Sequence, residues 1–253
     1  MSYSQHAAVK AIEYPESDGK PMAETDIHID TIIDLREALV EHFSDDPQVY
    51  VSGNLLIYYV EGNPKQRVAP DVFFVRGVPK HRRRVYFLWE EGVAPSVVFE
   101  ISSRGTYLED LQKKWQLYAQ LGISEYYLYD PEYDYLKESF IAYRLKDGVL
   151  EEVPVPDGMI HSPALGLDLV DTGQSLRLRN PQTGLFLPTP AERHVMLGQA
   201  EVARLQAEER AQAESAARLQ AEERVQAESA ARLQAEAETA RLREELKQLR
   251  TQS

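Results

Sequence analysis

Two apolar runs decide the fold: PDVFFVRGV at 70–78 and PSVVFEISS at 95–103. Their near-continuous Val, Phe and Ile content is typical of strands at the buried centre of a sheet. An acidic residue interrupts each run, Asp71 at the start of the first and Glu100 inside the second. Because burying a carboxylate without a partner is expensive, Glu100 indicates a functional site more than an ordinary core position.

A helix is predicted after the second run, from Thr106 to Leu121. Thr106 and Glu109 have the spacing of a capping box, in which two side chains satisfy the first backbone amides of a helix. Gly122 suits the left-handed residue that follows the last turn. The run EYYLYDP at 125–131 then predicts a further short strand.

Two adjacent lysines on this helix differ in the direction they are expected to take. Each helical residue turns by roughly 100°, so one packed face is formed by Leu108, Leu111, Trp115 and Tyr118. Lys114 lies at the flank of that face, whereas Lys113 lies on the far side. We therefore predict that Lys114 reaches back over the sheet and that Lys113 is solvated. In the alternative interpretation, Lys114 extends along the flank to water.

The remaining body has less pronounced patterns. Residues 1–22 carry Pro, Gly, Ser and mixed charge, which is typical of a flexible segment. The run VYVSGNLLIYYV at 49–60 predicts a strand or a bent hairpin, and residues 135–179 predict small antiparallel strands. A helix capped by Asp26 is predicted from Asp26 to Phe43, where apolar residues recur at helical spacing: Ile29, Ile32, Ile33, Val40 and Phe43.

A different segment begins near Ala200. ARLQAEERAQAESA at 203–216 is followed by ARLQAEERVQAESA at 217–230, a repeat of fourteen residues built from strong helix formers. Fourteen residues are two heptads, so a core register persists along the helix. One frame places at core positions Val202, Leu205, Ala216, Leu219, Ala230 and Leu233. The same frame also places there Glu209, Gln212, Glu223 and Gln226, while a cleaner seam is formed by Leu242, Leu246 and Leu249.

Two interpretations of this tail remain open: a coiled-coil dimer and a single charged helix with frayed ends. A homodimer formed through the body is a third arrangement. We therefore divide the chain into a flexible segment at 1–22, a body at 23–190 and a charged helical tail at 191–253.

Composition limits the functional classes. The 253 residues carry a formal net charge of −13 and no cysteine, which excludes disulfides and thiol chemistry. The tail from residue 200 holds 9 Lys and Arg against 11 Asp and Glu, so most of the negative charge lies on the body. An acidic body argues against tight non-specific nucleic-acid binding. The basic run at 80–84 is the main exception, either as a solvated loop or as a phosphate-contact patch.

Several other classes are disfavoured. No apolar run reaches the roughly 20 residues of a membrane helix, and the N-terminus lacks the layout of a signal peptide, so we expect a cytoplasmic protein without membrane contact. The six histidines show no zinc spacing. Nucleotide-binding glycine loops and a G-x-S-x-G elbow are also missing from the sequence.

The stretch from Gly53 to Pro131 resembles the putative restriction endonuclease domain family, within the PD-(D/E)XK nuclease superfamily. The resemblance rests on the spacing of three segments: RVAPDVFFV at 67–75, VVFEISS at 97–103 and DLQKKWQLYAQLGISEYYLYDP at 110–131. It implies an α/β fold of the restriction-endonuclease type, in which helices flank a mixed β-sheet. It also implies a metal-dependent endonuclease that hydrolyses phosphodiester bonds of nucleic acid, with DNA as the expected substrate.

The resemblance further implies roles for individual residues. Asp71 and Glu100 would bind Mg²⁺ or Mn²⁺, and the carbonyl of Ile101 would add a third contact. The lysine of the superfamily usually stands two residues after the second acid, where this chain has Ser102. In this family it is placed on the following helix, which points to Lys114. Lys114 would orient water or neutralise the transition state, and Ser102 would hydrogen-bond a metal ligand or phosphate.

A rival interpretation comes from a different functional class. The body would retain the nuclease fold with weak or no turnover, and the tail would recruit a partner or self-associate. Metal binding at Asp71 and Glu100 distinguishes the two interpretations.

Overall fold

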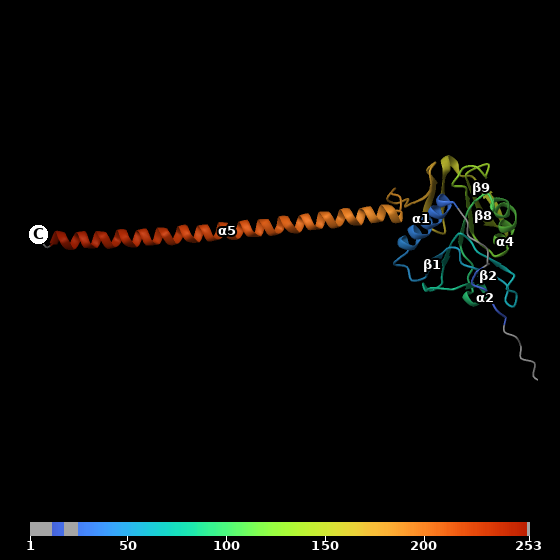
Figure 1. The fold of residues 1–253 in the computed structure, drawn as a ribbon, viewed down its shortest axis with the longest axis horizontal. Helices are drawn as coiled ribbons and strands as arrows, with labels where there is room; N and C mark the ends of the chain where they lie inside the picture. Colours follow the sequence, from blue (N-terminus) through green and yellow to red (C-terminus); the bar gives the residue numbers. More distant parts are fainter. Residues whose placement is uncertain (1–11, 18–24, 252–253) are drawn as a thin grey trace, which may run out of the picture. The chain divides into compact units, whose positions relative to one another are not determined.

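The computed structural model describes residues 12–17 and 25–251 (Figure 1). The chain forms two compact units, Met1–Glu192 and Arg193–Ser253. The first unit is an α/β body, and the second is the greater part of one long C-terminal helix. Among the residues just given, no helix combines the length and the apolar character needed to cross a membrane.

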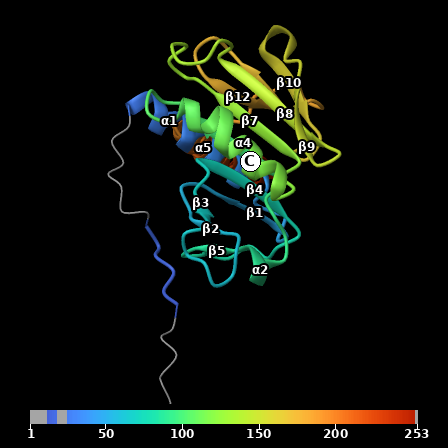
Figure 2. The ribbon, with the colours of Figure 1, turned by 90° about the vertical axis from the view of Figure 1, so that its right-hand side faces the viewer.

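A six-stranded mixed sheet forms the centre of the body (Figure 2). The strand order is β1-β4-β6-β7-β8-β9, in which β6 and β7 are parallel and the other neighbours antiparallel. The strands are β1 (Val49–Ser52), β4 (Val72–Arg76), β6 (Val97–Ile101), β7 (Glu125–Tyr129), β8 (Phe140–Lys146) and β9 (Val149–Val153). Every residue of β6 and all but the last residue of β4 are buried, which confirms the prediction of two central strands.

Two layers of side chains cover this sheet, because successive strand residues point to opposite faces. Val97, Phe99 and Ile101 pack on one face with helix α1 (Asp26–His42). Val98 packs on the other face with Tyr118, which belongs to a helical segment in three parts. These parts are α3 (Tyr107–Glu109), a π-helical turn η1 (Asp110–Lys114) and α4 (Trp115–Gln120).

Two three-stranded sheets complete the body. One has the order β3-β2-β5 and consists of β2 (Ile57–Tyr58), β3 (Arg67–Val68) and β5 (Tyr86–Phe87), followed by the short helix α2 (Leu88–Glu91). The other has the order β10-β11-β12 and follows the 3₁₀ turn η2 (Pro156–Gly158). Its strands are β10 (Met159–Ser162), β11 (Leu167–Asp171) and β12 (Leu176–Arg179). The run at 49–60 is therefore divided between two sheets and forms neither one strand nor a hairpin.

The structure corrects three predictions about helices. Asp26 is the first residue of α1 and its N-cap is Thr25. The predicted apolar face of α1 is rotated: Ile29 and Ile33 are exposed, and the buried face instead contains His28, Thr31, Ile32, Leu35, Ala38 and Leu39. The polar His28 and Thr31 lie on the buried side, so the apolar pattern alone gave the wrong face.

The capping box predicted at Thr106 and Glu109 does not form, whereas one forms at the start of the C-terminal helix. Thr106 makes no side-chain cap, and its hydroxyl instead accepts a hydrogen bond from the Ser103 amide at 3.2 Å. A reciprocal box forms between Thr189 and Glu192, with amide-to-side-chain distances of 2.9 and 3.3 Å. It begins the helix α5 (Pro190–Thr251), which starts before the repeats at 203 and before the predicted start near Ala200. Gly122 adopts the predicted left-handed conformation.

One described residue of the N-terminal segment, Tyr14, contacts the body. The Tyr14 ring lies against the rings of Tyr58, Phe87 and Trp89, and its hydroxyl accepts the Gly62 amide at 2.7 Å. The remainder of the segment predicted to be flexible lies outside the described residues.

Helix α5 presents its predicted core positions to solvent in the single chain. Leu205, Leu219 and Leu233 are 48%, 59% and 66% exposed. Arg218 and Arg232 each pair with a glutamate four residues later, at 3.0 and 2.9 Å, and such pairs add a few tenths of a kcal/mol each. The side chains of Leu246 and Leu249 lie outside the described part, so the terminal seam stays a prediction.

Candidate active site

The two acids that interrupt the apolar runs lie on neighbouring antiparallel strands. The register pairs Val72 with Phe99, which places Asp71 opposite Glu100. The Ile101 amide donates a hydrogen bond to Asp71 Oδ2 at 2.7 Å. Glu100 is fully buried, and 14% of the Asp71 side chain is exposed. The pair therefore lies where the sheet core meets the surface.

Gly53 fixes the backbone of Asp71. A Cβ atom at position 53 would lie 2.2 Å from the carbonyl oxygen of Asp71, which is closer than side-chain carbons approach backbone atoms. The next residue, Asn54, donates its amide to the carbonyl of Pro70 at 2.9 Å. The absence of a side chain at position 53 thus lets the end of β1 support the start of β4 at close range.

Lys114 lies against the second acid. Its Nζ atom donates to Glu100 Oε2 at 2.8 Å and lies 2.8 Å from Asp110 Oδ1. The other oxygen of Glu100 accepts a short hydrogen bond from the Tyr118 hydroxyl. Lys113 is exposed. Both oxygens of a fully buried carboxylate are therefore held in place by one helical segment.

The π-helical turn explains why the regular-helix prediction is only partly correct. Leu108 was expected on the packed face and is 56% exposed, while Asp110 is buried. A π turn closes hydrogen bonds over five residues in place of four, so each residue turns by less than in an α-helix. The rotation calculated from Leu108 fails across this turn. Trp115 and Tyr118 lie beyond it and pack on the sheet as predicted.

Burial controls the electrostatics of the cluster. Burial raises the pKa of Glu100 to about 7, with Lys114 lowering it and Asp71 raising it further. Burial also raises the pKa of Asp110 to about 6, helped by Glu100 and opposed by Lys114. For Lys114, burial acts to lower the pKa, but Glu100 and Asp110 outweigh it and hold the pKa above its ordinary value. Lys114 therefore stays protonated. Its single positive charge is outnumbered by the carboxyl groups of Asp71, Glu100 and Asp110.

The neighbours of the site include groups that sequence analysis missed. Asp110 was missed although it stands four residues before Lys114, a spacing that favours ion pairs on a helix. His28 was also missed: its Nε2 lies 2.7 Å from the Ile101 carbonyl oxygen and 4.0 Å from Asp71 Oδ2. Ser102 is 1% exposed, and its hydroxyl has no hydrogen-bond partner in the described part of the chain.

The donor atoms at this site fit a hard divalent cation. Across residues 12–17 and 25–251, no group of three His, Cys, Asp or Glu side chains is arranged to hold a metal. A site here would consist of the Asp71 and Glu100 carboxylates and the Ile101 carbonyl, with water completing the shell, as is common for Mg²⁺. A carbonyl oxygen has two lone pairs, and His28 uses one of them. The oxygen donors are therefore suitable in chemistry.

Comparisons with known proteins show the family of this chain. A family model described as "Putative restriction endonuclease", Uma2, matches residues 6–174. The chain belongs to this family. One similar solved structure is described as a putative nuclease belonging to DUF820 from Anabaena variabilis ATCC 29413, at 16% identity and a TM-score of 0.44. That match covers 58% of this chain and 76% of the other. No curated protein matches the chain.

Proposed function

We propose that this protein is a metal-dependent endonuclease that hydrolyses phosphodiester bonds of nucleic acid, most readily of DNA. The family supports a nuclease, and its description as a restriction endonuclease supports DNA. The single observation that carries the proposal is the contact between Lys114 and the buried Glu100, which faces Asp71 across two strands. A purely structural core has little reason to gather these charges, because each must be desolvated.

Asp71, Glu100 and the carbonyl of Ile101 would hold Mg²⁺ or Mn²⁺. The ion, when bound, supplies Lewis acidity to the phosphate and lowers the pKa of a water. Counted as ionised groups, Asp71, Glu100 and Asp110 with Lys114 leave a charge of −2, which a divalent cation neutralises. The hydrogen bond from the Ile101 amide keeps one Asp71 oxygen in place and orients the other.

Lys114 would act on the substrate through its remaining donor. An ammonium has three donors, and Nζ lies 2.8 Å from an oxygen of Glu100 and of Asp110. We propose that the third donor is directed to the attacking water or to a phosphoryl oxygen, where it offsets charge that grows in the transition state. Asp110 positions the ammonium, and Tyr118 positions the carboxylate of Glu100.

Ser102 is the fourth proposed participant. Its hydroxyl is buried two residues beyond Glu100, with no partner in the described part of the chain. An unsatisfied buried hydroxyl carries a desolvation penalty of about 1–3 kcal/mol. A phosphate oxygen or a metal-bound water would satisfy it, which is a reason for a serine at the position where related nucleases carry their lysine.

The test is a cleavage assay with matched variants. Purified protein is incubated with supercoiled and linear DNA in Mg²⁺, Mn²⁺ or EDTA. We expect cleavage that requires the metal, that is lost in Asp71→Ala and Lys114→Ala, and that remains in Lys113→Ala. The Lys113 variant removes the same charge from the neighbouring exposed position, so it controls for net charge.

Two outcomes would overturn the proposal. Equal cleavage by wild type and the Asp71 variant would identify a contaminating nuclease. Absence of cleavage by any form, together with no stabilisation of the wild type by Mn²⁺, would favour the rival interpretation of an interaction protein with a nuclease fold.

A further inference from the structure

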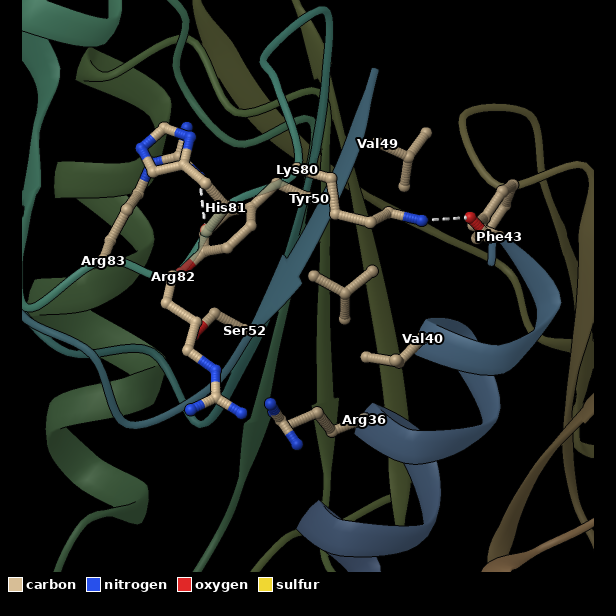
Figure 3. Close-up of a pocket in the computed structure, with 11 residues that line it drawn as sticks. Arg36, Val40, Phe43, Val49, Tyr50, Ser52, Lys80, His81, Arg82 and Arg83 are labelled. Atoms are coloured by element: carbon tan, nitrogen blue, oxygen red, sulfur yellow. Dashed lines mark hydrogen bonds between the residues drawn. The ribbon is translucent and has the colours of Figure 1, made fainter. Parts of the chain in front are cut away.

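A second feature lies at the open edge of the large sheet. Strand β1 is the edge strand, and a cavity of about 520 Å³ lies over it. Helix α1 contributes Arg36 and Val40 to one side, and the loop that contains His81, Arg82 and Arg83 forms the other (Figure 3). We refer to this space as the edge cavity. It is separate from the Lys114 cluster, which lies on the opposite face of the sheet.

The edge cavity is strongly basic in an acidic protein. Its lining includes Arg36, Lys80, Arg82 and Arg83 and contains no Asp or Glu. The chain as a whole carries −13. Two of the four cations are paired with acids outside the lining, Arg36 with Glu37 and Arg83 with Glu91. Lys80 and Arg82 have no acidic partner in the described part of the chain, so the cavity keeps an excess of positive charge that favours an anionic ligand.

Two of these cations have structural roles. Lys80 Nζ donates to the carbonyl oxygens of Phe43 and Ser44 at 2.7 and 2.9 Å, which satisfies the end of α1. Arg83 pairs through two nitrogens with Glu91, at 2.5 and 2.9 Å, and lies 4.2 Å from the centre of the Tyr50 ring. Their charges contribute to the field of the cavity while their donors are engaged.

The other two are placed to bind a ligand. Arg82 is exposed and makes no hydrogen bond or ion pair with any described residue. Arg36 contacts Glu37 through Nη1, which engages one of the five donors of its guanidinium. In Figure 3 the guanidinium ends of Arg36 and Arg82 point toward one another. Two facing guanidinium groups are suited to a phosphate between them.

One lining residue of the edge cavity, Arg36, lies close to Asp71 of the proposed active site. A Cβ atom at Gly53 would lie 2.2 Å from the Asp71 carbonyl oxygen and 3.7 Å from Arg36 Cδ. Arg36 and Asp71 are thus neighbours across Gly53. The lining also contains the apolar residues Val40, Val49 and Val51, which suit a sugar or base attached to the phosphate.

We propose that the edge cavity binds a backbone phosphate of the nucleic acid strand beside the bond that is cleaved, with Arg36 and Arg82 as its ligands. The inference rests on the proposed function, because it assigns the path of that substrate. It explains how an acidic body holds a polyanion: the cations are concentrated at one place next to the acids, and the rest of the surface remains negative.

The test measures binding without cleavage. A fluorescein-labelled DNA oligonucleotide is titrated with full-length protein in EDTA, and anisotropy is followed over a range of salt concentrations. Arg82→Ala is compared with Arg84→Ala, which removes the same charge two residues away, outside the cavity, where Arg84 pairs with Glu16. We expect Arg82→Ala to weaken binding roughly tenfold, the value of one charged hydrogen bond. The salt slope should fall by about one, and Arg84→Ala should match the wild type.

Two results would overturn the inference: equal affinities of the Arg82 and Arg84 variants, or no DNA binding by the wild type at low salt. Because these measurements need no turnover, they are independent of the cleavage assay. A protein that binds through Arg82 but never cleaves would refute the proposed function and would still show that the edge cavity binds a nucleic-acid phosphate.

Discussion

Replacing Lys114 with methionine tests the charge arrangement on which the proposed site depends. Methionine keeps an unbranched apolar stem and removes the ammonium that contacts Glu100 and Asp110. Removal of one partner from a buried ion pair costs about 3–5 kcal/mol, because the other partner stays buried and charged. Lys113→Met is the matched control, and as an exposed substitution it should change stability by less than about 0.5 kcal/mol.

The cost should depend on pH, because the carboxylates can take up protons instead. With Lys114 present, the pKa values of Glu100 and Asp110 are already about 7 and about 6. Without the ammonium these folded-state values rise further above those of the unfolded chain. The folded variant then binds more protons than the unfolded chain, so its stability falls as pH rises through this range.

The magnitude follows from the proton balance. One pKa unit corresponds to about 1.4 kcal/mol. At pH 6 both acids of the variant are largely protonated, and this protonation costs less free energy than at pH 8. At pH 8 the two acids must either take up protons against a higher pH or stay buried as unpaired charges. The destabilisation relative to wild type should therefore be about 3–5 kcal/mol at pH 8 and smaller by roughly 1–3 kcal/mol at pH 6.

Urea unfolding followed by tryptophan fluorescence measures both numbers, since Trp115 is partly buried beside the site and donates to the Leu150 carbonyl at 2.9 Å. A loss for Lys114→Met that is the same at both pH values would refute the reasoning, because the acids would then not titrate with the lysine. An equal loss for Lys113→Met would refute the assignment of the lysine itself.

Three further predictions concern the metal, Gly53 and the tail. Mn²⁺ should raise the melting temperature of wild type more at pH 8 than at pH 6, because protons compete with the metal at Glu100. Mn²⁺ should not change the melting temperature of Asp71→Ala. Calorimetry measures both effects, and an unchanged metal response in that variant would exclude Asp71 as a ligand. Gly53→Ala should lower the free energy of unfolding by about 1–3 kcal/mol through overpacking and should remove the stabilisation by Mn²⁺. Gly105→Ala is the control and should do neither, because position 105 has open space around it. Chemical denaturation with and without Mn²⁺ would show whether the two variants differ. Deletion of residues 200–253 should change the unfolding free energy of the body by less than about 0.5 kcal/mol, because the described side chains of 201–244 are exposed. Sedimentation of the same deletion shows whether the tail is needed for any dimer.

The central strands and helix positions were predictable because their signals are local. Apolar runs gave β4 and β6, and helical spacing gave the extent of α1 within one residue of its observed end. The faces were less predictable. The buried side of α1 includes His28, whose ring contacts the Ile101 carbonyl, and this contact joins residues 73 positions apart. No local pattern contains it.

The π turn illustrates the same limit at the site. The sequence DLQKK at 110–114 favours an ordinary helix, and nothing in it marks a wider turn. The turn becomes intelligible only with the tertiary partners in place. Asp110 is buried where it contacts Lys114, while Leu108 is displaced to solvent. Tertiary contacts that place a cation between two buried acids have overridden the apolar pattern of one turn.

The same cluster suggests how the proposed site would be kept ready before a metal binds. Glu100 is held at both oxygens, by Tyr118 and Lys114, so its orientation does not depend on a bound ion. Such a site costs folding free energy, because three acids are placed near one cation in a partly dry environment. A divalent ion would recover part of that cost on binding, since it is the charge that the cluster lacks. The excess of carboxylates around Lys114 is therefore the reason both for the expected stabilisation by a metal and for the proposed chemistry.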